Sequence, residues 1–262
     1  MVYRIALGVL AFLLTVYAMW IEPNWIKINH HDMRSNKDTD RIRIVQLSDL
    51  HIQHMGEREI AVVDQVKALT ADLVVLSGDV IDKPDRLPEL HKFIEALDGT
   101  PTVAVLGNWE YWSGVDLGAL REEYHHHGIR LLVNDRTSYQ VRQRTLHVLG
   151  IDDFTAGDPD YRLLNMPIEE EASILVQHSP GYFDRLSADF SSDQFRLCIA
   201  GHTHGGQIAL LGRPLWKPPG SGSFAAGLYD TRACKLFVSK GIGTSLLPIR
   251  FGARPEIAVF DL

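Results

Sequence analysis

Residues 41–51 read RIRIVQLSDLH, an apolar and β-branched run that is followed at once by Asp49 and His51. The pattern recurs at residues 73–77, where LVVLS leads into GDVID at 78–82. A short run that is apolar throughout is typical of a strand buried on both faces of its sheet. Because ligands collect where the strands of such a sheet end, the two stretches predict an α/β fold with a polar site at one sheet edge.

Three more predicted strands end in the same way. They are 102–106, followed by GNWE at 107–110; 173–176, followed by QH at 177–178; and 196–200, followed by GHTHGGQ at 201–207. Aspartate and histidine are costly to bury without partners, so packing alone does not explain five such strand ends. The glycines beside them allow tight turns and a close approach of the backbone.

Helices alternate with strands mainly in the first half of the chain. Apolar spacing predicts helices over 57–70, 87–97 and 117–127. Further strands are predicted at 131–133, 139–141, 146–151, 207–210, 235–238 and 257–260. This distribution predicts mixed sheets rather than a purely parallel, doubly wound one.

The composition fits one globular domain behind a separate N-terminal segment. The chain has 262 residues, of which 45% are hydrophobic and 23% charged, and a net charge of −7. An isoelectric point of 5.9 argues against nucleic acid as a partner, because nucleic-acid binders usually carry a basic surface. The two cysteines, Cys198 and Cys234, are too few for a disulfide framework, and Cys198 is predicted to be an inert residue of a buried strand.

The N-terminal segment over residues 5–21, IALGVLAFLLTVYAMWI, carries no charge and approaches the length that spans a bilayer. Trp20 and Trp25 lie at its downstream end, where an aromatic belt would sit. A cleaved signal peptide and a buried helix of the domain are the alternatives. Because residues 17–20 lack the small-x-small pattern of a cleavage site, an uncleaved membrane anchor over 1–25 is favoured.

A polar, proline-interrupted stretch follows the anchor and is read as a connector over 26–40, with the catalytic domain over 41–262. More positive charge follows the apolar segment than precedes it. Positive residues favour the cytoplasmic side of a membrane, so the sequence predicts a catalytic domain in the cytoplasm. The lack of paired-looking cysteines agrees with that compartment.

Seven nitrogen and oxygen donors follow the predicted strands, which is too many for one zinc ion. They are Asp49, His51, Asp79, Asn108, His178, His202 and His204. Two ions about 3.5–4 Å apart, sharing a bridging carboxylate, can clamp a phosphoryl group and generate a hydroxide nucleophile. No thiolate takes part, so the expected cofactors are two divalent ions, with Mn preferred and Fe, Zn or Mg as alternatives.

The blocks D-x-H, G-D-x-x-D, G-N-x-E, H and G-H-x-H stand in the order of the calcineurin-like metallophosphoesterase superfamily, which the chain resembles over residues 40–262. Residues 202–207, 235–244 and 248–251 resemble its membrane-associated branch. That branch includes bacterial envelope phosphoesterases and a UDP-2,3-diacylglucosamine pyrophosphatase of lipid A synthesis. The resemblance implies a four-layer α/β/β/α sandwich of two mixed sheets flanked by helices. It also implies a place at the bacterial inner membrane, with a single-pass or monotopic anchor.

The resemblance implies a role for each matching position. Asp49, His51 and His204 would hold the first metal, Asn108, His178 and His202 would hold the second, and Asp79 would bridge both. Asp82 would orient a ligand from behind. The catalytic residues would be Asp79, Asn108 and His202.

One position departs from the family pattern. The third block usually carries a histidine that is thought to protonate the leaving group, but Trp109 stands there, and Glu110 thereby loses its usual partner. Indole does not titrate and offers only one N–H donor. General-acid help is typically worth about 10²–10⁴ in rate, so Trp109 favours a leaving group that needs little protonation, as in a phosphoanhydride. His54 and His147 are alternative proton donors.

Aromatic residues beside the predicted metals are candidates for substrate binding. Trp109, Tyr111 and Trp112 are read either as a wall that contacts the substrate or as core packing under the loop. Leu211, Leu215 and Trp216, with Pro218 and Pro219, are read either as a second apolar rim near the membrane or as an ordinary loop. Arg250 and Arg254 fit equally a contact to a phosphate or lipid head group and a cap on the final strand.

Three functions follow from these observations. The leading one is a membrane-anchored hydrolase of a lipid-linked nucleotide, which cleaves UDP-2,3-diacylglucosamine to lipid X and UMP. The alternative is a broad-specificity phosphodiesterase or phosphatase of the cell envelope. The third, a metal-binding scaffold without activity, is disfavoured by the intact set of seven donors.

Overall fold

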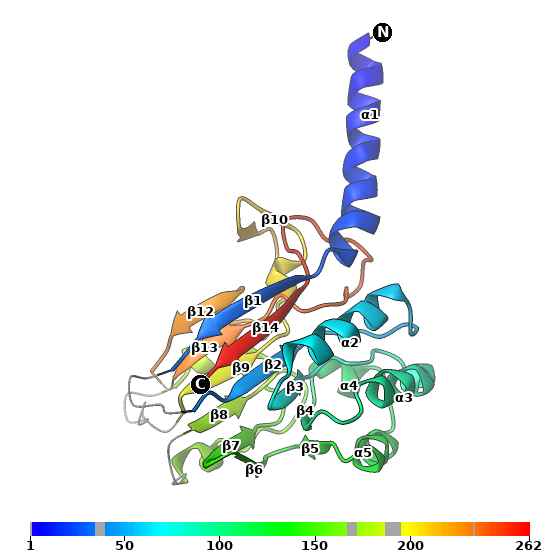
Figure 1. The fold of residues 1–262 in the computed structure, drawn as a ribbon. Coiled ribbons are helices and arrows are strands. Elements are labelled where there is room, and N and C mark those ends of the chain that lie inside the picture. Colours follow the sequence, from blue (N-terminus) through cyan, green and yellow to red (C-terminus); the bar gives the residue numbers. More distant parts are fainter. Residues whose placement is uncertain (1, 35–39, 167–171, 187–194, 233) are drawn as a thin grey trace.

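Two mixed sheets stack face to face in the computed structural model, which describes residues 2–34, 40–166, 172–186, 195–232 and 234–262 (Figure 1). Each sheet has six strands, in the orders β1-β14-β2-β3-β4-β5 and β12-β13-β9-β8-β7-β6. A two-stranded hairpin, β10-β11, lies apart from both sheets. The expected α/β fold with two mixed sheets is confirmed.

The first sheet lies between a layer of helices and the second sheet. Its strands are β1 (Lys27–Asp32), β14 (Glu256–Asp261), β2 (Arg43–Leu47), β3 (Leu73–Ser77), β4 (Thr102–Val105) and β5 (Arg130–Leu132). Strands β2 to β5 run parallel, and β14 runs antiparallel to β2. The helices predicted from apolar spacing cover the outer face: α2 (Glu57–Leu69), α3 (Leu87–Ala96) and α5 (Leu117–His126).

Strand β3 shows why the central runs are apolar at every position. Val74 and Leu76 pack against the helices, whereas Leu73 and Val75 pack against the second sheet. All four side chains are fully buried. A strand covered on both faces has no position that favours a polar side chain, so the alternation typical of a half-exposed strand is lost.

The second sheet contributes the other half of the inter-sheet core. Its strands are β12 (Gly227–Asp230), β13 (Lys235–Val238), β9 (Leu197–Ala200), β8 (Ala172–Val176), β7 (Arg144–Gly150) and β6 (Asp135–Val141). Ile174 and Ile199 face the first sheet, whereas Leu175 and Leu236 face outward. In the described part of the chain, the short 3₁₀ helices η4 (Tyr161–Asn165) and η5 (Pro180–Asp184) lie on the outer face of this sheet.

Cys198 and Cys234 form a disulfide, with Cα atoms 6.0 Å apart. Cys198 is a fully buried residue of a strand, as predicted, but the expectation that the two cysteines do not pair is wrong. Strand β13 lies beside β9 with Leu236 opposite Cys198, and Cys234 stands two residues before Leu236 on the same face. The two cysteines are separated by 36 residues, so only the pairing of these strands brings them together.

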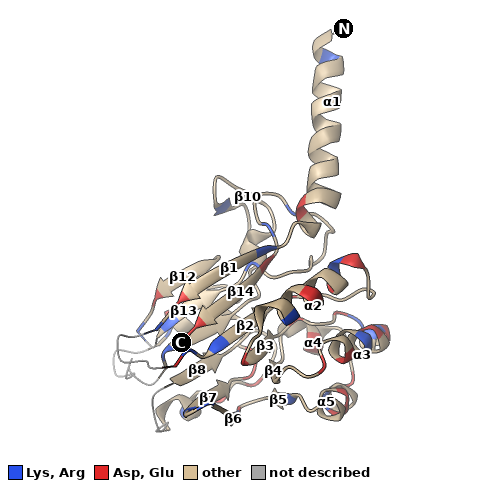
Figure 2. Cartoon of the chain, viewed as in Figure 1, with Lys and Arg blue, Asp and Glu red and all other residues tan. Residues whose placement is uncertain are grey.

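Helix α1 (Val2–Val16) continues through η1 (Tyr17–Ile21) and η2 (Glu22–Asn24) and projects from the domain (Figure 1). Residues 2–24 are long and apolar enough to cross a membrane, a test that a signal sequence also passes. Figure 2 shows helix α1 almost free of charged residues along its length. The buried carboxylate of Glu22 accepts the backbone N–H groups of Gly252 and Ala253 at 3.0 and 2.7 Å, which fixes the base of the helix to the domain.

The stretch expected to be a polar connector, 26–40, contains a strand of the first sheet. Strand β1 pairs in parallel with β14, and its His31 ring packs against the rings of Phe237 and Phe260. The connector prediction is wrong for these residues, while residues 35–39 lie outside the described part of the chain. An edge strand is half exposed and can be polar. The sequence of β1, KINHHD, therefore lacks the apolar pattern that indicates a buried strand.

Candidate active site

Five strands deliver polar side chains to one edge of the two sheets. Strands β2, β3 and β4 are parallel neighbours in the first sheet, and β8 and β9 are parallel neighbours in the second. The seven donors predicted from the sequence stand at the ends of these strands, and none is more than 5% exposed. The strand ends therefore gather seven polar side chains in a buried place, as the sequence predicts.

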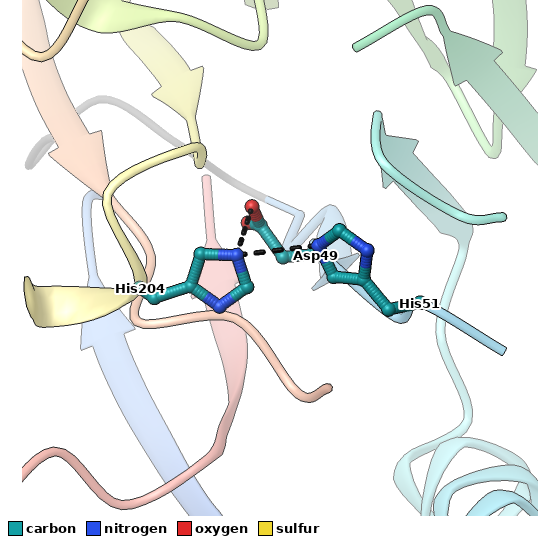
Figure 3. Close-up of side chains that lie close together, drawn as sticks. All are labelled: Asp49, His51 and His204. Carbon is teal, nitrogen blue, oxygen red and sulfur yellow. Dashed lines mark hydrogen bonds and ion pairs between the residues drawn. The ribbon is translucent and has the colours of Figure 1, made fainter. Parts of the chain in front are cut away.

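Asp49, His51 and His204 form the first group, drawn in Figure 3. The Nε2 atom of His204 lies 3.3 Å from Nε2 of His51 and 3.3 Å from Oδ1 of Asp49. Such separations are those of ligands around one ion whose bonds are about 2.0–2.2 Å long. Two loops distant in sequence thus converge on a single point.

Asp79, His178 and His202 form the second group. The Nε2 atom of His178 lies 3.1 Å from Oδ2 of Asp79. Asn108 joins the group because its Oδ1 lies 2.7 Å from Nδ1 of His202. A carboxylate, an amide and two imidazoles therefore surround this second point.

The carboxylate of Asp79 lies between the two groups. Its Oδ2 is 3.1 Å from Nε2 of His178 and 3.8 Å from Nε2 of His51, while its Oδ1 accepts the backbone N–H of Trp109 at 2.8 Å. Burial opposes ionisation, but the charges of His178 and His51 outweigh it and lower the pKa of Asp79. Asp79 is therefore an anion placed to face both groups.

Hydrogen bonds to backbone carbonyls turn the other ring nitrogen of two histidines toward the neighbouring donors. Nδ1 of His178 donates to the carbonyl of Ser77 at 2.8 Å, and its buried Nε2 has no hydrogen-bond partner among the described residues. Nε2 of His202 donates to the carbonyl of Pro219 at 2.7 Å, so the lone pair of His202 is on Nδ1. Carbonyls behind histidine ligands fix the tautomer in this way at metal sites. The donor set therefore fits divalent metal ions.

Five of the seven donors stand on backbone in the left-handed region. Their φ angles are 51° for Asp49, 43° for His51, 52° for Asp79, 71° for His202 and 51° for His204. Such a conformation costs a residue other than glycine about 1–3 kcal/mol. Because five strained residues share one site, local stability does not explain this backbone, whereas a ligand held by the strained residues does.

Two glycines let the carboxylates approach the backbone closely. A Cβ atom on Gly107 would lie 2.3 Å from Oδ1 of Asp79. A Cβ atom on Gly241, whose φ is +67°, would lie 2.6 Å from Cβ of Asp49. Both positions therefore require glycine.

Asp82 lies behind the first group. Its Oδ2 is 3.7 Å from Nδ1 of His51, the ring nitrogen that faces away from His204. Gln53 donates to both oxygens of Asp82, at 2.8 and 2.9 Å. Burial favours the neutral acid, but the contacts to His51 and Gln53 outweigh it and lower the pKa of Asp82. The carboxylate is thus an anion able to orient the His51 ring.

Glu110 has a role that its sequence block does not reveal. Its carboxylate accepts the backbone N–H groups of Gly107, Asp79 and Val80 at 2.8, 3.0 and 2.7 Å. Burial, followed by the charge of Asp79, raises the pKa of Glu110 to about 7. Glu110 therefore ties the loop after β3 to helix α4 (Asn108–Trp112) and positions Asp79.

Arg250 is a fully buried cation beside the first group. Its guanidinium donates to the carbonyls of Gly243 and Ala253, and Nη2 lies 3.4 Å from Nδ1 of His204. Burial lowers the pKa of Arg250 to about 10, so it stays charged at neutral pH. Its backbone N–H donates to the carbonyl of Ala18 at 2.9 Å, so the same residue touches the base of the N-terminal helix.

A family model described as calcineurin-like phosphoesterase matches residues 42–206, a span that contains all seven donors. The chain belongs to the calcineurin-like phosphoesterase family. Its two donor groups and its family together make it a metal-dependent phosphoesterase.

Relatives of this phosphoesterase include two bacterial proteins that match it over most of their length. The uncharacterised metallophosphoesterase YkuE of Bacillus subtilis (strain 168) is 30% identical, over 94% of this chain and 88% of the relative. Phosphodiesterase YaeI of Escherichia coli (strain K12) is 27% identical, over 94% of this chain and 92% of the relative. These similarities support phosphoester hydrolysis as the activity class.

A solved structure described as GAP50, the anchor in the inner membrane complex of Plasmodium, is similar to this phosphoesterase with a TM-score of 0.51. The two are 13% identical, and the match covers 85% of this chain and 81% of that one. At this identity the likeness concerns the fold alone.

Four of the seven donors of the phosphoesterase line a cavity of about 410 Å³. Buried Asp79, Asn108, His202 and His204 line its floor, and its walls include Trp109, Trp112, Leu215, Trp216, Leu246 and Leu247. Leu246 and Leu247 were not predicted as site residues. Two adjacent leucines in a loop that contains Gly and Pro could have indicated an exposed apolar surface. A polar floor under apolar walls suits a phosphoester that carries an apolar group.

The three aromatic candidates lie in different places. Trp109 packs its ring edge against His51, with centroids 6.0 Å apart, and Trp112 lies beside it at the cavity wall. Tyr111 donates its hydroxyl to Asp152 at 2.6 Å and packs against the core. Of the described residues that line the cavity, none is Tyr111, His54 or His147, so neither alternative proton donor reaches the cavity wall.

Proposed function

We propose that this phosphoesterase is a membrane-anchored phosphodiesterase of the cell envelope that works with two metal ions. The observation that carries the proposal is the pair of donor groups with Asp79 between them, on the floor of an apolar-walled cavity. In this proposal Asp49, His51 and His204 hold one ion, Asn108, His178 and His202 hold the other, and Asp79 contacts both. Manganese is the first choice, because imidazole, carboxylate and amide ligands without a thiolate suit it.

Two divalent ions, when bound, supply Lewis acidity toward phosphoryl oxygens and a nucleophile at neutral pH. The residues of the chain hold this arrangement in place. The carbonyls of Ser77 and Pro219 keep His178 and His202 in the tautomers that can ligate. The hydroxyl of Ser48 and the backbone N–H of His202 both donate to Asp49. The ligands are thus pre-oriented before any substrate arrives.

Trp109 determines which leaving groups the site serves. Its indole lies against His51, where the family usually places a titrating histidine, and it has no proton to transfer at neutral pH. Substrates whose leaving group departs as a stable anion are therefore favoured: activated diesters and phosphoanhydrides before simple alkyl esters.

A lipid-linked phosphoanhydride is the second candidate, with UDP-2,3-diacylglucosamine cleaved to lipid X and UMP. Trp109 and the apolar cavity walls favour it. This candidate requires an active site that faces the cytoplasm, as the positive residues after the N-terminal helix predict. The Cys198–Cys234 disulfide favours the opposite side of the membrane, because disulfides persist in oxidising compartments. For this reason the envelope phosphodiesterase comes first.

The test compares two substrates on the detergent-purified full chain with Mn²⁺: bis-p-nitrophenyl phosphate and UDP-2,3-diacylglucosamine. Metal-dependent hydrolysis of the diester without UMP release supports the first candidate, and UMP release supports the second. Cells quenched with acid and treated with a maleimide report the compartment: two thiols that react only after reduction indicate the envelope. Hydrolysis of neither substrate overturns both candidates.

A further inference from the structure

The mouth of the cavity is exposed and apolar. Two loops form it, the β10-β11 hairpin (Ala209–Leu210 and Arg213–Pro214) with the residues just after it, and residues 245–247. We define the apolar rim as Leu210 (59% exposed), Leu211 (96%), Leu215 (69%), Trp216 (60%), Leu246 (78%) and Leu247 (57%). Clustered exposure of large apolar side chains marks a surface that is covered in use.

The two loops of the apolar rim are tied into one surface. The side chain of Gln207 accepts the backbone N–H of Ser245 at 2.9 Å and donates to the carbonyl of Leu247 at 2.7 Å. The backbone N–H of Ala209 donates to the carbonyl of Phe251 at 2.7 Å. The rim is therefore a built feature of the domain rather than two independent loop tips.

The chain that follows residues 245–247, at Arg250 and Phe251, contacts the base of the N-terminal helix. The ring of Tyr17 packs edge to face on Phe251, with centroids 5.9 Å apart, and Ala18 accepts the backbone N–H of Arg250. Figure 1 shows the β10-β11 hairpin at the end of the domain from which α1 projects. The rim and the exposed helix thus share one end of the molecule.

The two loops of the apolar rim, residues 207–217 and 243–251, carry no acidic residue, although the whole chain is acidic. The net charge is −7, yet Asp230 is the only acidic residue between positions 194 and 255. Arg213 and Lys217 flank the rim residues of the hairpin, and Arg254 stacks on Trp25 at the base of the helix, 3.7 Å from the ring centroid. Apolar side chains bordered by cations fit the surface of an anionic bilayer.

We propose that the apolar rim inserts into the interface of an anionic phospholipid bilayer, as a second membrane contact beside helix α1. The cavity then opens at the membrane surface and receives phosphoesters from the lipid phase. The inference rests on the membrane anchoring that the proposed function assigns to α1.

An environment-sensitive fluorophore tests the insertion directly. Both native cysteines are in the disulfide, so a maleimide dye labels only the new thiol of L211C in the full chain. In vesicles of phosphatidylcholine and phosphatidylglycerol, the dye at position 211 is expected to shift to the blue, brighten several-fold and be quenched by brominated acyl chains. The dye on L10C in α1 reports anchoring, and the dye on E122C in α5, at the opposite end of the domain, is expected to stay aqueous.

An aqueous spectrum at position 211, with a quenched dye at position 10, overturns the rim proposal and leaves the anchor standing. Aqueous spectra at both positions overturn the rim proposal together with the anchor. A blue-shifted dye at position 211 that brominated lipids do not quench also overturns the proposal, because it shows a protein partner or a second copy on the rim.

Activity gives a second test. L210D/L211D changes two rim residues that lie outside the described cavity lining. It is expected to lose several-fold of the turnover of a phosphodiester lipid in vesicles and to hydrolyse soluble bis-p-nitrophenyl phosphate as the wild type does. L228D, an exposed leucine on β12, is the matched control and should change neither rate. Equal rates of L210D/L211D and wild type on vesicles contradict the proposal, whereas a wild type inactive on both substrates contradicts the proposed function instead.

Discussion

The floor and the mouth of the cavity depart from ordinary burial in opposite directions. At the floor and directly beneath it, the seven polar donors are almost completely buried, and five of them stand on strained backbone. At the mouth, six large apolar side chains are mostly exposed. Each arrangement lowers the stability of the folded domain. Both therefore indicate a functional role rather than a contribution to folding.

The two regions also differ in how they are held. Particular hydrogen bonds orient side chains of the floor, such as His178 to the carbonyl of Ser77 and His202 to the carbonyl of Pro219. The mouth is fixed through its backbone, by Gln207, while its side chains remain without such bonds to direct them. The difference indicates that the floor sets the reaction and the mouth sets what reaches it. Substitutions on the floor should therefore change turnover, and substitutions at the mouth should change substrate preference.

The largest effect is expected for D79N, which removes the charge that both donor groups face. Loss of one electrostatic group of an active site typically costs about 10²–10³ in kcat, and D79N should lose at least that much. Turnover of bis-p-nitrophenyl phosphate with Mn²⁺, together with metal content by mass spectrometry, measures it. D64N, on the exposed face of α2, is the control. Retained activity with any phosphoester would contradict the two-ion assignment.

A smaller effect on the floor is expected for D82N, which leaves all seven donors in place. The carboxylate behind a ligand histidine typically contributes about 10–100-fold to metal affinity or activity. D82N should therefore need more Mn²⁺ to reach half of its maximal rate and regain most of that rate at saturation. A metal titration of turnover checks this. An unchanged titration curve would show that His51 does not depend on Asp82.

Trp109 lies where the floor meets the mouth, and W109H tests which region it serves. A histidine there supplies a general acid, so hydrolysis of alkyl phosphodiesters should rise by about tenfold, a part of the 10²–10⁴ that such catalysis can give. The new histidine should also add its own dependence of the rate on pH near 6–7 to the pH profile of the wild type. Rates measured from pH 5 to 9 on alkyl and p-nitrophenyl esters provide the comparison. A fall in activity on both esters would assign Trp109 to packing.

The smallest effect on turnover is expected for W112A, at the wall of the cavity. Removing an exposed aromatic contact should raise KM for substrates with an acyl chain a few-fold and leave kcat for soluble diesters unchanged. Steady-state kinetics on a short-chain and a long-chain phosphodiester measure the difference. A change in kcat that is equal for both substrates would move Trp112 from the mouth to the floor.

The floor was predictable from sequence because each donor directly follows an apolar strand, and strand order brings the ends together. The mouth was only partly predictable. Leu211 and Trp216 were candidates for a rim, but Leu246 joins them only through the contacts of Gln207. Arg250 was a candidate for a phosphate or lipid contact or for a strand cap, but its side chain is fully buried and bonds to the carbonyls of Gly243 and Ala253, which no sequence pattern reveals.

Two errors have a common physical cause. Strand β1 looked like a connector because an edge strand needs apolar residues on one face only. The disulfide was missed because pairing between β9 and β13, not spacing along the chain, sets the distance between Cys198 and Cys234. In both cases the deciding partner lies far away in sequence.

The carboxylate of Glu22 makes the N-terminal helix a rigid attachment of the domain rather than a flexible one. A flexible linker would let the domain swing through a wide volume and sample ligands on either side. The backbone N–H groups of Gly252 and Ala253 instead donate to Glu22, which holds the base of the helix against the domain. If the helix stands in a membrane, the cavity then has a fixed height and a fixed tilt above it. The contact between the helix base and the domain would then determine which substrates the enzyme reaches. Inserting a few flexible residues after position 24 would abolish this restriction.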